Sequence, residues 1–326
     1  MKPQPTRGII PALTLFVLTP LVAEYLLGSL SIAQLGALPI LCFLYGSAAV
    51  LIRESARTRK RGWPTVVILG TAYAIIEEGL ATQSLFNPHY LHLRLLDYGY
   101  IPFLGMGASW TVYVLALHVI WSICVPIAIV EALFPAVGET PWLGVKGWSI
   151  FGLLLLAGIL GVTGYTRRTE QFFAAPPQLV ASGFLALLLI FVALRRGGKE
   201  MVAFTETKRA PTPWAVGAFA FVAGSAFELV QAFQAHGFSW EVGVLSRVAL
   251  VILAIGQIGR WSARDGWSAV HRAALGVGGL LVYCWWGFSV EVSLHGKGGL
   301  VAHTILVVLA VGLGAVASVR AARAER

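Results

Sequence analysis

Residues 64–83 read PTVVILGTAYAIIEEGLATQ, an apolar stretch that carries two adjacent glutamates, Glu77 and Glu78. A stretch of about 20 mostly apolar residues is long enough to cross the hydrocarbon core of a bilayer as a helix. An ionisable side chain at membrane depth is costly unless it faces a partner or a water-filled cavity. Two adjacent carboxylates also disfavour each other's ionisation. The stretch therefore predicts a membrane protein with a polar interior.

The composition of the whole chain also indicates a membrane protein. Of its 326 residues, 57% are hydrophobic and 12% are charged, which is about half the charged fraction of a typical soluble domain. Ten segments are apolar enough to span a membrane: residues 9–28, 35–53, 64–84, 107–134, 147–165, 177–195, 213–235, 241–259, 268–288 and 299–319. Open sheets cannot span lipid, so we expect an all-α bundle of ten transmembrane helices. Residues 1–326 are predicted to form one integral membrane domain.

The basic residues predict how the helices are oriented in the membrane. With both termini in the cytoplasm, 19 of the 24 Lys and Arg residues fall on the cytoplasmic side. These include Lys2, Arg7, Arg53, Arg57, Arg196 and Lys199, whereas the opposite side holds Arg94, Arg167, Arg168 and Lys297. Because cytoplasmic connections are rich in Lys and Arg, both termini are predicted to be cytoplasmic in a cell membrane. The net charge of +9 then reflects orientation in the lipid bilayer, and no nucleic-acid partner is expected.

Residues 35–165 and 177–288 show a faint likeness to each other. Each unit contains a Trp-Pro or Pro-Trp pair after a basic connection, and a glutamate follows fifteen residues after Trp63 and fourteen after Trp214. Each unit later carries Gly-Trp-Ser at the start of a helix. Because carriers often contain duplications, we predict a parallel internal repeat in which Glu228 is the counterpart of Glu78.

Several other polar side chains lie inside the predicted helices at similar depth. A rise of 1.5 Å per residue places the two glutamates, Glu228 and His118 roughly 16–22 Å along their helices. Helical spacing puts Glu228 and Gln231 on one face, and Arg247 belongs to the following helix. The candidate ion- or substrate-binding residues are Glu77, Glu78, His118, Glu228, Gln231 and Arg247. Together they predict a polar site in the outer half of the bilayer.

Some polar residues also have a structural interpretation. Glu228 and Arg247 are candidates for a buried ion pair that joins two neighbouring helices. Glu24 lies near the end of the first helix, where its side chain would reach water, and Glu291 and His303 are expected at the surface. Residues 84–106 form the one long connection on the outer side, and they would cover the polar site as a lid or mouth.

The runs Glu77-Glu78-Gly79-Leu80-Ala81-Thr82 and Val114-x-x-x-His118 carry a family resemblance. They resemble the motifs EExxxR and FxxxH of the CAAX protease and bacteriocin-processing (CPBP) family of intramembrane proteases. The resemblance implies a water-activating glutamate, with Glu78 and His118 as catalytic residues. Thr82 replaces the arginine, Val114 replaces the phenylalanine, and the third motif, HxxxN, has no counterpart. The chain also lacks HExxH, GxSxG and Walker A motifs, which argues against zinc proteases, serine hydrolases and ATP-driven pumps.

These residues fit three classes of protein. The first is a secondary transporter, in which Glu77 and Glu78 take up and release a proton or another cation. The second is a membrane-embedded hydrolase, with Glu78 as general base and His118 stabilising the oxyanion or binding a metal. The third is a non-catalytic accessory subunit whose polar residues only pack helices. The sequence leaves open which small solute, ion or membrane peptide is bound, and whether a metal or cofactor takes part.

Overall fold

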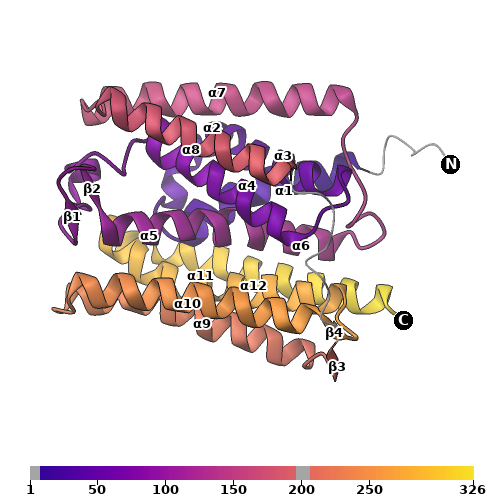
Figure 1. The fold of residues 1–326 in the computed structure, drawn as a ribbon. Coiled ribbons are helices and arrows are strands. Elements are labelled where there is room, and N and C mark those ends of the chain that lie inside the picture. The colour runs from indigo at the N-terminus through magenta and orange to yellow at the C-terminus, as the bar shows by residue number, and fades with distance from the viewer. Residues whose placement is uncertain (1–7, 196–205) are drawn as a thin grey trace.

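Ten membrane-spanning helices form the body of the protein (Figure 1). The computed structural model describes residues 8–195 and 206–326, so Lys2, Arg7, Arg196 and Lys199 of the orientation prediction lie outside the described residues. Ten helical spans in the described part are long and apolar enough to cross a membrane: Ile9–Leu26, Ile32–Thr58, Trp63–Ala81, Ala108–Leu133, Val145–Glu170, Pro176–Arg195, Pro213–Gln234, Trp240–Ser262, Ala269–His295 and Lys297–Ala324. The predicted all-α bundle of ten spans is therefore confirmed.

Each of the first four spans contains one π-helical segment. In chain order, they comprise α1 (Ile9–Pro20) and η1 (Leu21–Leu26); η2 (Ile32–Ala37), α2 (Leu38–Leu41), η3 (Cys42–Gly46) and α3 (Ser47–Thr58); α4 (Trp63–Ile76) and η4 (Glu77–Ala81); and α5 (Ala108–Leu117), η6 (His118–Cys124) and α6 (Val125–Leu133). Of these, η1, η3, η4 and η6 are the π-helical segments, and η2 is a 3-10 turn. Because π-helical turns occur frequently at functional sites, the first four spans are the favoured location for one.

The remaining six spans are continuous α-helices. They are α7 (Val145–Glu170), α8 (Pro176–Arg195), α9 (Pro213–Ala235), α10 (Trp240–Ser262), α11 (Ala269–His295) and α12 (Leu300–Ala324), the last preceded by a 3-10 turn, η7 (Lys297–Gly299). The connections contain a further 3-10 turn, η5 (Tyr90–His92), and four short strands. Strand β1 (Tyr100–Ile101) pairs antiparallel with β2 (Met106–Gly107), and β3 (Glu206–Arg209) pairs parallel with β4 (Arg264–Asp265).

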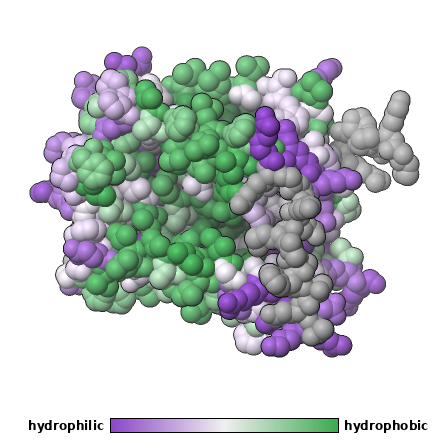
Figure 2. All heavy atoms as spheres, in the orientation of Figure 1, coloured by the Kyte–Doolittle hydropathy of each residue, from purple (hydrophilic) through white to green (hydrophobic). Residues whose placement is uncertain are grey.

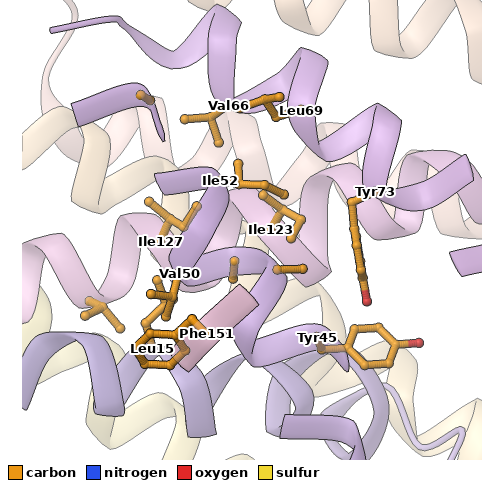
Figure 3. Close-up of a cluster of buried hydrophobic side chains, with 14 of the residues drawn as sticks. Leu15, Tyr45, Val50, Ile52, Val66, Leu69, Tyr73, Ile123, Ile127 and Phe151 are labelled. Atoms are coloured by element: carbon orange, nitrogen blue, oxygen red, sulfur yellow. The ribbon is translucent and has the colours of Figure 1, made fainter. Parts of the chain in front are cut away.

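The fourth span, α5–η6–α6, lies between two groups of helices (Figure 1). On one side, Ile123 and Ile127 pack into a core cluster with residues of α1, α3, α4, α7 and α8, part of which is drawn in Figure 3. On the other side, Val125 and Ile129 pack into a second cluster with residues of α9, α11 and α12. One helix therefore contributes a face to both cores. The internal repeat of residues 35–165 and 177–288 stays a prediction.

The outward faces of the bundle are apolar. Leu153 on α7, Leu187 on α8 and Leu253 on α10 are 67–68% exposed. Figure 2 shows this apolar surface between two ends where hydrophilic residues gather. An exposed apolar surface of this extent would be unstable in water but matches the hydrocarbon core of a bilayer. The fold is that of an integral multi-pass membrane protein.

A buried ion network joins the second and fourth spans. Arg53 is fully buried and contacts the carboxylates of Glu54 at 3.2 Å and Glu131 at 3.1 Å. Arg57 pairs with the other oxygen of Glu131 at 2.6 Å. The sequence prediction ended the second helix at residue 53, but the structure continues it to Thr58. Both arginines therefore belong to the helix, where buried partners balance their charge.

Close packing of α9 on α11 depends on glycine. A Cβ atom on Gly278 of α11 would collide with the carbonyl oxygen of Gly217 on α9. By contrast, a Cβ atom on Gly312 of α12 would meet open space. Small residues that let two backbones approach are a common means of joining membrane helices.

Candidate functional site

Glu77, Glu78 and His118 meet inside the first group of helices. The Nε2 atom of His118 lies 2.7 Å from Oε2 of Glu77 and 2.6 Å from Oε1 of Glu78. Their exposed fractions are 2% for Glu77, 6% for Glu78 and 5% for His118. The structure thus places the three residues that the sequence singled out most strongly in one buried carboxylate–imidazole centre.

The π-helical segments are what bring this centre together. Glu77 and Glu78 open η4, and the amide of Thr82 donates to the carbonyl oxygen of Glu77, five residues earlier, at 2.8 Å. His118 opens η6 of the fourth span. The other two π-helical segments also contribute to the surroundings, because η1 contains Glu24 and η3 contains Tyr45. All four π-helical segments of the first four spans therefore supply residues to one region.

Hydroxyl groups hold the outer atoms of the three side chains. Tyr45 donates to Oε1 of Glu77 at 3.2 Å, and Ser122 lies 3.3 Å from Nδ1 of His118. Thr82 donates to Oε2 of Glu78 at 3.1 Å, and the hydroxyl of Ser84 donates to the same oxygen. The remaining atoms, Oε2 of Glu77, Oε1 of Glu78 and Nε2 of His118, face one another.

Two tyrosines pack on the imidazole ring. Tyr45 stacks on His118 with 5.7 Å between ring centroids, and Tyr73 meets it edge-on at 6.0 Å. Figure 3 shows both tyrosines at one side of the aliphatic core. The hydroxyl of Tyr73 and Oε2 of Glu77 are buried and have no hydrogen-bond partner in the described part of the chain. The centre therefore keeps unused hydrogen-bonding and ligand capacity.

The centre has more carboxyl groups than basic side chains. Glu77 and Glu78 each contact His118, and in the part of the chain that the structure describes neither pairs with a Lys or Arg. A third carboxylate, Glu24, is close enough to interact electrostatically with His118 and Glu78. The sequence prediction that Glu24 simply reaches water is therefore incomplete, because Glu24 is half-buried beside the centre.

The connection that follows η4 contacts the centre through its first residues. Ser84 links Glu78 to Trp110, whose indole N–H donates to the Ser84 hydroxyl at 3.1 Å. Burial, together with the nearby carboxylates, raises the pKa of the Tyr90 hydroxyl well above its ordinary value of 10.0. Asn87 donates to Glu170 at the end of α7 at 3.4 Å. These contacts fit the predicted cover over the polar site.

The connection after η4 has an unusual backbone. Gln83, Leu91, His92 and Arg94 all have positive φ angles, between 51° and 59°. Residues other than glycine persist in this conformation where surrounding contacts impose it, and such residues cluster at functional sites. At Gln83 the contact is visible, because its side-chain oxygen accepts a hydrogen bond from the amide of Ala174 at 2.7 Å.

Glu228, Gln231 and Arg247 form a second cluster with another face of the fourth span. Arg247 donates to Gln231 at 2.6 Å and to Ser109 at 2.9 Å. Glu228 instead accepts a hydrogen bond from Tyr113 at 2.9 Å. The ion pair suggested for Glu228 and Arg247 is wrong, because within the described residues no contact of ion-pair length joins them. Uncharged side chains accept hydrogen bonds from the two terminal nitrogens of Arg247, while its Nε has no partner among the described residues. The candidate residues thus divide into two clusters.

Two further expectations are also wrong. Glu291 is 1% exposed and His303 is 2% exposed, although both were expected at the surface. The helices that carry them are longer than predicted, since α11 continues to His295 and the last span begins at Lys297. Both residues therefore lie where two helices pack together. Tyr45 and Tyr73 were not singled out at all, although the four-residue spacing of Tyr73 and Glu77 places them on one helix face.

The fold and the centre define an integral multi-pass membrane protein with a buried carboxylate–imidazole site. The chain belongs to a family described as an uncharacterized membrane protein family, whose family model matches residues 13–324. That range includes every residue of the centre. No CPBP family model matches, so the resemblance of Glu77, Glu78 and His118 to the CPBP motifs is unconfirmed. Comparison with curated proteins and with solved structures gave no match.

Proposed function

We propose that the protein is a cation-coupled secondary transporter whose ion site is the carboxylate–imidazole centre. The observation that carries this proposal is the mutual contact of Glu77, Glu78 and His118, almost fully buried among membrane spans. Each of the four spans around them has a π-helical segment. Irregular backbone at membrane depth is tolerated where it lines a cavity or a site, and carriers build ion sites from such interrupted helices.

The charge balance of the centre favours a cation as the bound species. Glu77 and Glu78 bring up to two negative charges when both are ionised, whereas His118 supplies at most one positive charge. The nearby Glu24 adds a third carboxylate. An unpaired charge in a low-dielectric interior is costly, so a cation that enters the centre would be strongly stabilised.

The closed state of the centre suits an ion better than a larger substrate. The three side chains are 2–6% exposed, and Ser84 of the connection after η4 contacts Glu78 and is itself contacted by Trp110. An occluded state of this kind is the intermediate that alternating access requires between its two open states. Release of the ion would require the contact between Ser84 and Glu78 to break, which makes the connection after η4 the expected gate on one side.

Solid-supported-membrane electrophysiology on proteoliposomes tests the proposal. Concentration jumps of H⁺, Na⁺, K⁺, Mn²⁺ or Zn²⁺ are applied in turn, and the displaced charge is recorded. We expect the wild type to respond to at least one cation, and the isosteric Glu77→Gln/Glu78→Gln variant to lose that response. Glu291→Gln is the matched control, because it neutralises another buried carboxylate outside the centre. A folded double variant that responds like the wild type would contradict the proposal.

A second candidate is a glutamate-dependent intramembrane hydrolase. One observation favours it: the 2.6 Å contact of Glu78 with His118 joins the two residues that match the CPBP motifs. Against it, Thr82 stands where the CPBP motif has its arginine, and the third motif, HxxxN, has no counterpart. Cleavage of single-span membrane peptides, read by mass spectrometry and lost in Glu78→Gln, would favour the hydrolase over the carrier. If neither Glu77→Gln/Glu78→Gln nor Glu78→Gln changed charge displacement or peptide cleavage, and a partner protein co-purified with the chain, an accessory subunit would instead be favoured.

A further inference from the structure

We infer that the carboxylate–imidazole centre binds one divalent transition-metal cation, with Oε2 of Glu77, Oε1 of Glu78 and Nε2 of His118 as its protein ligands. The inference rests on the proposed transport function for the role of the metal as cargo or coupling ion. The binding itself is argued from the geometry of the three side chains. Their ligand atoms all lie within 4.8 Å of one another, and all three residues are buried.

The hydrogen bonding among the three side chains is incomplete without a further group. Nε2 of His118 lies within 2.7 Å of two carboxylate oxygens, but a ring nitrogen carries one hydrogen at most and can donate it to only one of them. Accordingly, Oε2 of Glu77 has no hydrogen-bond partner although the residue is 2% exposed. A cation between the three atoms would satisfy all of them at once.

The surroundings are arranged as the outer shell of a metal site usually is. Each ligand residue is held through the atom that does not face the others: Tyr45 binds Oε1 of Glu77, and Ser122 lies against Nδ1 of His118. Thr82 holds Oε2 of Glu78. Such partners fix the orientation of carboxylate and imidazole ligands and are a regular feature of metal sites.

The spacing of the ligand atoms is close to what a metal requires. With bonds of about 2.1 Å in a tetrahedral arrangement, the ligand atoms of a transition metal lie roughly 3.4 Å apart. The measured separations of 2.6 Å and 2.7 Å are shorter by about 0.8 Å, a difference that small side-chain rotations would remove. The ring of Tyr73 meets the imidazole edge-on, and its buried hydroxyl has no hydrogen-bond partner among the described residues.

The donor atoms select the kind of metal. Imidazole nitrogen suits Zn²⁺, Fe²⁺ and related ions, whereas Mg²⁺ and Ca²⁺ are held by oxygen ligands. Two carboxylate oxygens add preference for Mn²⁺, Fe²⁺ and Zn²⁺ over Cu⁺, which favours sulfur ligands. Two negative charges would neutralise a divalent cation while His118 remains neutral, as a metal-bound imidazole is. We therefore expect Zn²⁺ and Mn²⁺ to bind and Ca²⁺ and Mg²⁺ to bind weakly.

Metal binding to the purified full-length protein tests the inference. The chain is stripped with a chelator, and Zn²⁺, Mn²⁺, Mg²⁺ and Ca²⁺ are titrated separately by calorimetry, with metal content measured by mass spectrometry. We expect about one Zn²⁺ or Mn²⁺ per chain, and at least a 100-fold loss of affinity in Glu77→Gln, Glu78→Gln and His118→Ala. X-ray absorption at the zinc edge should show only nitrogen and oxygen ligands. No binding of Zn²⁺ or Mn²⁺ by the wild type would overturn the inference.

Two further variants protect the test against loss of the fold. Ser122→Ala keeps all three ligands and removes only the group against Nδ1 of His118, so zinc affinity should fall about 10-fold. Glu291→Gln removes another buried carboxylate and should leave affinity unchanged. Equal losses of zinc affinity in Glu291→Gln and Glu78→Gln would show that the metal binds elsewhere and would refute this site. The two hypotheses can fail separately. Zinc binding without any charge displacement would refute cation transport but leave the metal site standing. Charge displacement by Na⁺ or H⁺ without zinc binding would refute the metal site but leave cation transport standing.

Discussion

The contact between His118 and Glu78 should appear as a large coupling free energy in a double-mutant cycle. The variants are Glu78→Ala, His118→Ala and their combination, each compared with the wild type in a chelator so that no bound metal adds stability. Each single change removes one short contact from a buried polar side chain, and we expect each to cost about 3–5 kcal/mol. The double variant removes both groups and should cost less than the sum of the two.

The size of the coupling follows from the geometry. The two atoms lie 2.6 Å apart and both side chains are buried, and a hydrogen bond that involves a charged group contributes about 1.5–3 kcal/mol. We therefore expect a coupling free energy of about 1.5–3 kcal/mol between His118 and Glu78. Denaturant titration of the detergent-solubilised protein, followed by tryptophan fluorescence, supplies the four free energies of unfolding.

Ser122 provides the matched control for this cycle. It contacts the other nitrogen of the same ring, at the longer distance of 3.3 Å, so its coupling to His118 should be about 0.5–1 kcal/mol. If the coupling of His118 to Glu78 did not exceed that of His118 to Ser122, the carboxylate–imidazole contact would contribute little. These residues would then not form one energetically coupled centre.

Three other predictions concern stability. Glu131→Ala should destabilise the protein by about 3–5 kcal/mol, because it leaves the fully buried Arg53 and the half-buried Arg57 with fewer partners. Glu139→Ala, whose side chain is 68% exposed, should cost less than about 1 kcal/mol. Equal free energies of unfolding for the two variants would disprove this difference. Gly278→Ala should lower the free energy of unfolding by about 1–3 kcal/mol through overpacking. Gly312→Ala adds its methyl group in open space and should not destabilise the protein. Thermal unfolding of the two variants in detergent tests this difference. The raised pKa of the Tyr90 hydroxyl favours its protonated form in the folded state, so stability should be retained below pH 10.0 and lost as pH rises further. Tyr90→Phe should reduce the loss of stability at alkaline pH. A variant whose stability depends on pH as the wild type's does would contradict this prediction.

The fold could be predicted from the sequence because membrane helices are defined by length and polarity. Each apolar run of about 20 residues must satisfy its backbone internally, which leaves helices as the simple solution. The helix ends could not be placed as well. Arg53 and Glu291 are polar, so they mark an expected end, yet in the structure they lie inside helices and are buried by contacts with other spans.

The centre could be predicted only in part. Glu77, Glu78 and His118 are ionisable residues at similar depth on consecutive spans, and this signal was sufficient to bring them together. The contribution of Tyr45 was not predictable, because its position depends on a π-helical segment that changes the direction of side chains along the second span. The separation of Arg247 from Glu228 depends on which face of the fourth span each contacts, and periodicity within one helix does not determine that.

The fourth span has a mechanical consequence that follows from its place between the two groups of helices. His118 on this span contacts the carboxylates of one group, and Tyr113, five residues earlier, contacts Glu228 in the other. A rotation of the helix that withdraws His118 from Glu78 must also change the distance between Tyr113 and Glu228. A ligand that binds one cluster in only one arrangement of this helix would therefore alter the free energy of rearranging the other cluster, and the effect would be reciprocal.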